Sequence, residues 1–230
     1  VILEDRVAKK EVINHISYEK TLLNSSLNNA LITDSGETIW IFKGEILPVL
    51  TYKNFNQLLS NVCRTVYSET PILRNELFNK QKLSSAISLA RVKLLDAMLE
   101  KSDKEDFGFA KETCPPEKAI YYTIFKSTGI HHKSKDGIFV LGEPQNDNII
   151  GLWDASDRFI KSTIEKPRKI SELIKALKAQ PIKLKQGVLD FWIPIIIYIR
   201  QQDFAIYNEN GAYVMNINKE LFELLQKKPG

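Results

Sequence analysis

The sequence predicts a mainly α-helical protein with a small β component, which is an α+β fold. Apolar residues recur at spacings of three and four along most of the chain, and this pattern is typical of amphipathic helices. Runs rich in β-branched and aromatic residues are short and few. The 230 residues are 43% hydrophobic and 26% charged, which is an ordinary globular composition and excludes global disorder.

Residues 1–165 are expected to form a mostly helical domain with a short strand near residues 38–42. The apolar stripes predict helices at residues 1–32, 55–66, 84–101, 116–128 and 149–164. The strand prediction rests on the β-branched and aromatic run Thr38–Phe42, which is followed by a glycine turn. Ile138–Val140 is a second candidate strand.

Polar and small residues mark where several of these helices begin and end. Asn54, and either Ser84 or Ser85, are predicted N-caps, because their side chains can accept a hydrogen bond from a backbone N–H of the first turn. In Cys114-Pro115-Pro116-Glu117 a proline fits the first turn of a helix, where its missing N–H costs nothing. Gly129 is the predicted residue after a helix end, where a positive φ angle is common.

Residues 166–230 are expected to form a winged-helix-like domain. Its predicted elements are a short helix capped by Ser171, a helix at Gly187–Arg200, a hairpin turning at Asn210-Gly211, and a helix at Lys219–Gln226. Helix, helix, hairpin and helix in this order are typical of a winged helix, which is a variant of the helix-turn-helix motif.

The apolar run from Val188 to Ile199 has three interpretations. It is twelve residues long and apolar except for Asp190, whereas a membrane-spanning helix needs about 20 apolar residues, so a membrane segment is excluded. Alternating isoleucines favour a strand, but a proline within a central strand is disfavoured. The preferred interpretation is an interior helix, in which Pro194 leaves the carbonyl of Asp190 without its helical hydrogen bond.

No catalytic residue, cofactor site or metal site is predicted in the chain. It contains neither the G-x-x-x-x-G-K-[ST] phosphate loop nor a recognisable nucleophile motif. Because adjacent side chains point in different directions, His131 and His132 are expected at a loop or helix end rather than on one metal. A helix C-terminus favours a cationic imidazole, which is the expectation for His131, shortly after Gly129. Asn75, Glu76 and Arg91 are read as satisfying loop backbones or forming an ion pair, in preference to an active site.

The cysteines and the first residues predict the compartment. Cys63 and Cys114 are too few for a disulfide framework, which favours a reducing compartment. The opening residues carry no secretory signal pattern, and the expected location is therefore cytoplasmic. The chain does not begin with methionine, and we expect it to be part of a longer protein.

Positive charge is concentrated in one segment of a chain whose net charge is only +4. Nine basic and two acidic residues lie between Arg158 and Gln186. The candidate nucleic-acid-binding residues within this segment are Arg168, Lys169, Lys175, Lys178, Lys183 and Lys185. Such a cluster neutralises phosphates when it faces nucleic acid. The alternative is a solvated surface balanced by acidic residues elsewhere in the fold.

Several short segments between about Pro71 and Pro229 follow one another in a characteristic order. They are Thr70-Pro71, Asn75-Glu76-Leu77, Ala90-Arg91 within Ala86–Leu95, Cys114-Pro115-Pro116-Glu117, Gly129-Ile130-His131, Leu152-Trp153, Gly187-Val188-Leu189 and Ala205-Ile206-Tyr207. In this order they resemble the large P-loop ATPases of BREX-type phage-defence systems and related bacterial ATP-binding proteins. The chain departs from that pattern at Gln180-Pro181-Ile182-Lys183, where the family has two prolines, an aromatic residue and a glycine.

The resemblance implies that the parent protein is an ATPase acting on DNA or on a defence complex. This chain would then be a region outside the nucleotide site. The expected function is a non-catalytic interaction or scaffold module, whose partners are other domains or subunits of an ATPase complex. The alternative is a module that binds the backbone of duplex DNA through the basic segment.

Overall fold

The computed structural model describes residues 5–31, 39–47 and 51–227. The chain divides into two compact units, Val1–Thr65 and Val66–Gly230. The described residues form eight α-helices and two separate antiparallel pairs of short strands. The prediction of a mainly helical fold with a small β component is therefore confirmed.

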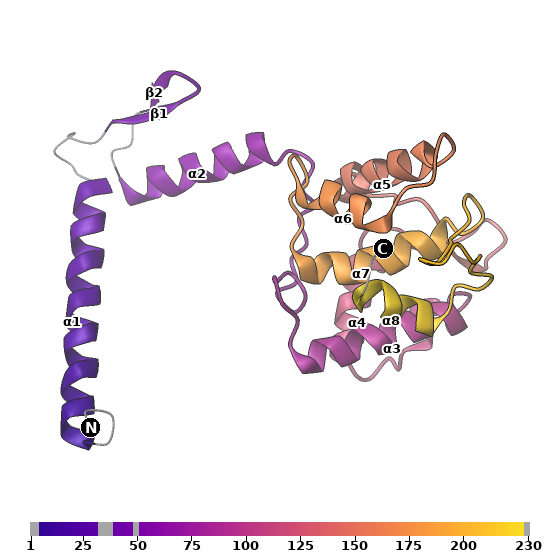
Figure 1. Ribbon diagram of the computed structural model, residues 1–230, viewed down its shortest axis with the longest axis horizontal. Coiled ribbons are helices and arrows are strands. Elements are labelled where there is room, and N and C mark those ends of the chain that lie inside the picture. Colours follow the sequence, from indigo (N-terminus) through magenta and orange to yellow (C-terminus); the bar gives the residue numbers. More distant parts are fainter. Residues whose placement is uncertain (1–4, 32–38, 48–50, 228–230) are drawn as a thin grey trace. The chain divides into compact units, whose positions relative to one another are not determined.

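The first unit contains two helices and a hairpin, labelled in Figure 1. Its elements are α1 (Arg6–Leu31), β1 (Trp40–Phe42), β2 (Glu45–Leu47) and α2 (Tyr52–Val66). Lys43 and Gly44 join the strands, and both have positive φ angles of 53° and 84°. Such angles belong to the two-residue turns whose twist matches a hairpin. The predicted strand is thus confirmed at Trp40–Phe42, while its first expected residue, Thr38, lies outside the described residues.

The second unit begins with helices that pack beside a small hairpin. Its first elements are α3 (Ser85–Lys101), a 3-10 helix (Glu105–Gly108), α4 (Pro116–Tyr121), a π-helical turn (Tyr122–Lys126), β3 (His131–Lys133) and β4 (Phe139–Leu141). Gly129 has a φ angle of +74° and follows the π-helical turn, as its predicted role at a helix end requires. The candidate strand at Ile138–Val140 is confirmed one residue later, as β4.

Four further helices complete the second unit. They are α5 (Ile150–Ser162), which a 3-10 helix at Asp147–Ile149 precedes, α6 (Ile170–Lys178), α7 (Gln186–Ile199) and α8 (Lys219–Lys227). Between α7 and α8 the predicted hairpin is reduced to a single bridge, Tyr207 with Tyr213, closed by a turn at Asn208 and Gly211. The helices and the turn follow in the predicted order, and their assembly as a winged helix stays a prediction.

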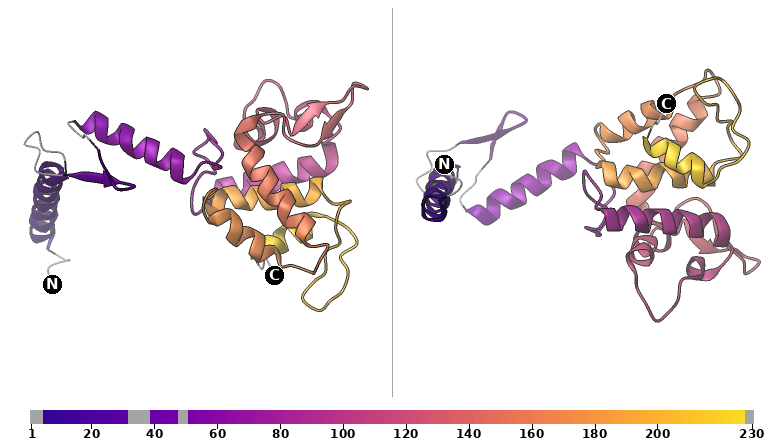
Figure 2. Two further views of the ribbon diagram at one scale, coloured as in Figure 1. Left: turned by 90° about the horizontal axis from the view of Figure 1, so that it is seen from above. Right: turned by 60° about the horizontal axis from the view of Figure 1, so that its bottom comes forward.

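Helix α7 lies at the centre of the second unit and packs against α3 and α8 (Figures 1 and 2). Ten of its fourteen residues are buried. The rings of Phe191 and Trp192 reach Phe78 and Trp153, with centroid distances of 5.4 and 6.5 Å. The helical interpretation of Val188–Ile199 is confirmed. The core of this unit extends from Leu73 to Leu225, so it draws on residues from both sides of position 165.

Two of the predicted helix caps differ from the observed ones. Of the two candidates Ser84 and Ser85, Ser84 caps α3, since its Oγ accepts from Ile87 N. Helix α2 begins earlier than expected, and Thr51 Oγ1 rather than Asn54 accepts from the first turn. Helix α6 begins after Lys169 rather than Ser171, because the Glu172 carboxylate accepts from Lys169 N at 3.1 Å and stabilises the earlier start.

Candidate functional site

Arg168, the first residue of the predicted basic site, is half-buried and is bonded to neighbouring side chains. Its Nε and Nη2 lie 3.0 and 2.8 Å from Glu172 Oε2, and its Nη1 lies 2.8 Å from Ser162 Oγ. The guanidinium carbon is 4.3 Å from the ring centroid of Phe159. Hydrogen bonds from Arg168 and from the Lys169 backbone lower the pKa of Glu172. Arg168 therefore helps to fix the start of α6, and its charge is already paired with Glu172.

The five lysines of the predicted site lie on or beside α6 and α7, and all are exposed. Lys175 and Lys178 are three positions apart on α6, so they share one face of that helix. Lys169 and Lys185 occupy the positions just before α6 and α7. Lys185 Nζ donates to the carbonyl of Asn79 at 3.1 Å. Lys183 lies in the connecting turn, where its φ angle is +56°.

Helix α7, which takes the place of a recognition helix in the predicted winged unit, lies in the core. A recognition helix reads DNA by placing side chains in the major groove. In α7 the side chains from Phe191 to Ile197 are all buried. The remaining residues of α7 are half-buried, namely Gln186, Asp190, Tyr198 and Ile199. Most of this helix is therefore not available to base edges, and DNA contact is expected to go through the lysines of α6 and its neighbours to phosphates.

Arg91 is buried and joins three helices. Its Nε donates to the carbonyl of Asp190 in α7 at 2.6 Å, its Nη2 to the carbonyl of Phe222 in α8 at 3.2 Å, and its Nη1 to Gln226 Oε1 at 3.1 Å. Burial lowers the pKa of Arg91, and the charges of Asp190 and Glu223 oppose this effect. A guanidinium has five donors in a planar fork, which suits it to bridging separate acceptors.

Arg91 also supplies the hydrogen bond that Pro194 cannot make. In a helix the N–H of residue 194 would donate to the carbonyl of residue 190, but proline has no N–H. The carbonyl of Asp190 is the one that receives Arg91 Nε. A buried carbonyl without a donor is costly. Arg91 of α3 therefore compensates for the backbone donor that Pro194 removes from α7.

Asn75 and Arg91, which the sequence offered as parts of one candidate site, bond to different elements. Asn75 Nδ2 donates to Thr123 Oγ1 at 3.0 Å and to the carbonyl of Ala119 at 3.3 Å, while its Oδ1 accepts from Leu77 N at 3.0 Å. These bonds hold the loop before α3 against α4. The interpretation that these residues satisfy backbone groups is confirmed for Asn75 and Arg91, and Glu76 is exposed.

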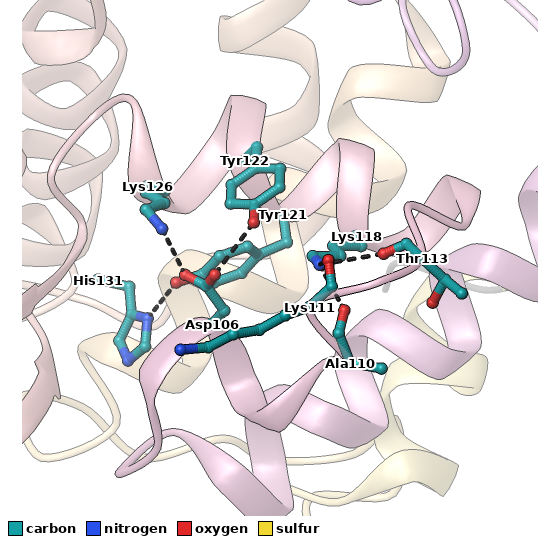
Figure 3. Close-up of polar contacts among 9 residues, drawn as sticks. All are labelled: Asp106, Ala110, Lys111, Thr113, Lys118, Tyr121, Tyr122, Lys126 and His131. Carbon is teal, nitrogen blue, oxygen red and sulfur yellow. Dashed lines mark hydrogen bonds and ion pairs between the residues drawn. The ribbon is translucent and has the colours of Figure 1, made fainter.

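A cluster of bonded polar side chains lies between the 3-10 helix and α4 in the second unit (Figure 3). Asp106 accepts from Lys126 Nζ at 2.8 Å and from the Tyr122 hydroxyl at 3.0 Å. Burial alone would raise the pKa of Asp106, but the hydrogen bonds from Lys126 and Tyr122 hold it below its ordinary value. Asp106, Phe107 and Gly108 all have positive φ angles, between 50° and 68°.

Tyr121 and His131 form a buried pair beside this carboxylate (Figure 3). The Tyr121 oxygen lies 2.6 Å from His131 Nδ1, and His131 Nε2 lies 2.9 Å from the carbonyl of Ser102. Since a carbonyl only accepts, Nε2 carries the proton and Nδ1 accepts from the tyrosine. Burial lowers the pKa of His131 and raises that of Tyr121. The expected cationic imidazole is therefore wrong for His131, because the residue lies in the core on β3 rather than at a helix end.

Lys118 completes the cluster on the other side of Tyr122. Its Nζ donates to the backbone carbonyls of Ala110 and Thr113, and the bond to Thr113 is 3.0 Å long (Figure 3). The Tyr122 ring lies between two ammonium groups, 5.7 Å from Lys118 Nζ and 4.9 Å from Lys126 Nζ. The polar atoms of this cluster are satisfied by one another, so the arrangement fastens residues 102–113 to α4.

The exposed apolar side chains of α1 are the feature that the sequence interpretation missed. From Lys9 to Asn29 every described side chain is exposed. Val12, Ile13, Ile16 and Leu27 keep 46 to 55% of their surface accessible, and Leu23 keeps 59%. The same residues had predicted the helix. Their spacing did not show that they would remain exposed among the described residues.

Neither a metal-binding group nor a membrane-spanning helix occurs within the described ranges. No group of three or more His, Cys, Asp or Glu side chains has the arrangement to hold a metal ion there. Among the helices of those residues, none combines the length and the apolarity that crossing a bilayer requires.

Comparison with known proteins gives no relative. No protein-family model matches the chain, and no curated protein and no solved structure is significantly similar to it.

Proposed function

We propose that the chain is a non-catalytic interaction module that joins a larger bacterial ATPase in the cytoplasm to its partner subunits. The observation that carries this proposal is the apolar stripe of α1, defined as Val12, Ile13, Ile16, Leu23 and Leu27, which is about half exposed over its whole length. Contiguous exposed apolar surface is uncommon on monomers and is typical of interaction sites.

The composition of α1 also favours a partner. The helix is 26 residues long, which corresponds to about 39 Å. Its second half contains Asn24, Ser25, Ser26, Asn28 and Asn29, and these residue types are weak helix formers. Helices without packing partners are marginal in water. Burial of the apolar stripe against another protein would provide the stabilisation that the sequence of α1 lacks.

The ATPase context rests on the order of segments that resembles the BREX-type family. All of those segments lie in the second unit or at its beginning. The phosphate loop of such an ATPase would lie elsewhere in the parent protein, and this chain would contribute contacts rather than chemistry. A role in phage defence is part of the same proposal.

Lysine footprinting of the parent complex tests this function. Lys9, Lys10 and Lys20 lie on α1 and are exposed, so they report on its environment. Acetylation rates would be measured by mass spectrometry for the chain alone and for the complex assembled on the full-length parent protein. We expect Lys20, which lies between Ile16 and Leu23, to be protected in the complex.

Lysines of the second unit provide the matched control for this experiment. Lys101 and Lys111 are exposed and are expected to react equally in both samples. If the α1 lysines acetylate as fast in the complex as in the isolated chain, the interaction module is refuted, since a docked helix cannot stay fully accessible.

A second function, contact with the backbone of duplex DNA, is favoured by the lysines of α6. Lys175 and Lys178 share an exposed face, and Lys169 and Lys183 are exposed at the two ends of the same segment. A winged-helix-like arrangement of α6, α7, the hairpin and α8 would present this segment to phosphates. Such binding is electrostatic and independent of sequence.

A salt titration of duplex binding tests this second function. Each phosphate contact contributes about 0.9 to the slope of log affinity against log salt. Replacing Lys175 and Lys178 with glutamine is expected to lower the slope by about 1.8 if both contact phosphates. The control is Lys111→Gln, outside the basic segment. Absence of binding at low salt would eliminate the DNA function and leave the interaction function untouched.

A further inference from the structure

We infer that Lys80 and Lys82, from the loop before α3, form one surface with the lysines around the end of α6, and that this surface binds the phosphate backbone of a nucleic-acid duplex. The inference rests on the second proposed function, contact with duplex DNA, and adds to it two residues from a distant part of the chain. The composite basic surface is defined as Lys80, Lys82, Lys175, Lys178, Lys183 and Lys185.

The loop at residues 79–82 is joined to the beginning of α7 by its backbone. Gly187 N donates to the carbonyl of Lys80 at 2.8 Å, and Lys185 Nζ donates to the carbonyl of Asn79 at 3.1 Å. A Cβ on residue 187 would lie 2.7 Å from that Lys80 oxygen, so the close approach requires glycine. The loop therefore lies beside the turn before α7, although 106 residues separate Asn79 from Lys185.

The same turn folds back on the end of α6. Leu184 N donates to the carbonyl of Leu177 at 2.9 Å. The last turn of α6 contains Lys175 and Lys178. The lysines of the composite basic surface thus lie on three segments that hydrogen bonds join to one another, namely the loop, the turn and the end of α6. The fold, rather than the sequence spacing, brings the loop lysines to the others.

The charges of this surface are not paired within the protein. All six lysines are exposed, and no ion pair among the described residues includes any of them. Residues 77–95 and 173–189, which supply these lysines, contain no aspartate or glutamate. A surface with one sign of charge attracts a polymer of the opposite sign.

Most of the carboxylates that flank these two stretches are already engaged. Of the four, three have partners, which are Lys219 for Asp96, Arg168 for Glu172 and Gln186 for Asp190. The fourth, Glu76, is exposed. The positive charge of the surface is therefore largely left for a ligand.

The residue types of the surface favour nucleic acid over an acidic protein. Protein–protein interfaces are depleted of lysine, whereas lysine contacts to phosphates are a main part of nucleic-acid interfaces. An ammonium on a flexible stem meets a phosphate without the fixed geometry that a guanidinium imposes. Recognition through such contacts is independent of base sequence.

A duplex fits the surface better than a single strand. Proteins that bind single strands stack the bases on exposed aromatic side chains. Residues 77–95 and 173–189 contain one aromatic residue, Phe78, and it is completely buried. The surface thus offers charge for the backbone but no ring for an unpaired base.

A salt titration of duplex binding by the full chain, followed by fluorescence anisotropy, tests the inference. Replacing Lys80 and Lys82 with glutamine is expected to lower the slope of log affinity against log salt by about 1.8, because each phosphate contact contributes about 0.9. The matched control replaces Lys133 and Lys135 with glutamine. These two lysines are exposed, have the same spacing and remove the same charge, so we expect their slope to equal that of the unchanged chain. Urea unfolding of each variant checks that the second unit remains folded.

Four results would overturn the inference. If the pair Lys175 and Lys178 lowers the slope but the pair Lys80 and Lys82 does not, the loop is not part of the surface and the DNA function stands. Absence of duplex binding at low salt refutes both. Tighter binding of a single strand of the same length would contradict the duplex. Displacement of the duplex by polyglutamate at equal charge concentration would assign the surface to an acidic protein.

Discussion

The pairing of Arg91 with the carbonyl of Asp190 predicts that the cost of losing Arg91 depends on residue 194. We consider Arg91→Met, which keeps the length of the side chain and removes its donors, in the unchanged chain and in a Pro194→Ala background. In the unchanged chain no N–H of α7 can replace Arg91 at Asp190. In the alanine background the N–H of residue 194 can donate to that carbonyl.

The expected cost follows from the contacts of Arg91. Leaving the buried carbonyl of Asp190 without a donor costs about 1–3 kcal/mol. The bond to the Phe222 carbonyl is lost too, whereas Gln226 is exposed and re-pairs with water. We therefore expect Arg91→Met to lower the free energy of unfolding by about 2–4 kcal/mol. In the Pro194→Ala background the cost should fall by about 1–2 kcal/mol.

Urea unfolding of the four proteins in this cycle measures the coupling. Trp153 and Trp192 lie in the core of the second unit, so their fluorescence reports its unfolding. Coincidence of the fluorescence and circular dichroism transitions for that unit checks the two-state assumption. Replacement of Pro194 alone should not destabilise strongly, because alanine is the better helix former.

Equal costs of Arg91→Met in both backgrounds would refute the reasoning. That result would mean that the backbone N–H of residue 194 in the Pro194→Ala background does not replace the hydrogen bond that Arg91 donates to the carbonyl of Asp190. The role of Arg91 would then reduce to its contacts with α8, which the Pro194 background leaves unchanged.

Two further predictions concern stability and pH. Gly187→Ala should destabilise the second unit strongly, because a Cβ there would lie 2.7 Å from the carbonyl oxygen of Lys80. The control is Gly142→Ala, whose Cβ meets only the movable side chain of His132. Equal unfolding midpoints of the two variants would contradict this prediction. His131 has a folded pKa below its ordinary 6.5, so the unfolded state binds more protons and stability should fall as pH drops below about 6.5. This loss should disappear from urea unfolding of His131→Gln but persist in His132→Gln.

Local patterns in the sequence were sufficient to predict the helices, but only β1 and β4 among the four strands of the described residues. The interior helix α7 was predictable because the run of twelve residues is too short to span a membrane and because proline is disfavoured in a central strand. The predicted capping residues failed at α2 and α6, where Thr51 and the carboxylate of Glu172 stabilise starts earlier than Asn54 and Ser171 would give. Caps depend on single hydrogen bonds, and several neighbouring polar residues can make them.

The roles of the polar residues depended on contacts that spacing does not reveal. The sequence predicted that Pro194 would free the carbonyl of Asp190, but it could not show that Arg91, 99 residues earlier, lies beside it. Arg168 was predicted as a cation for phosphates, yet Glu172 and Phe159 take its charge and its planar face. The exposure of α1 could not be predicted either, because an apolar stripe indicates that a helix face is buried but not which residues bury it.

The left-handed turn at Asp106 and Phe107 shows how the second unit sustains a strained backbone. A non-glycine residue in this conformation costs about 1–3 kcal/mol, and here two follow each other. The turn puts the Phe107 ring into the core, with its centroid 4.7 Å from that of Tyr121, and burying a phenylalanine contributes about 1.5–3 kcal/mol. Asp106 is turned to Lys126 by the same geometry. Two such residues together cost about 2–6 kcal/mol, so the burial of Phe107 offsets a large part of the strain, and the bonds of Asp106 to Lys126 and Tyr122 add to this compensation.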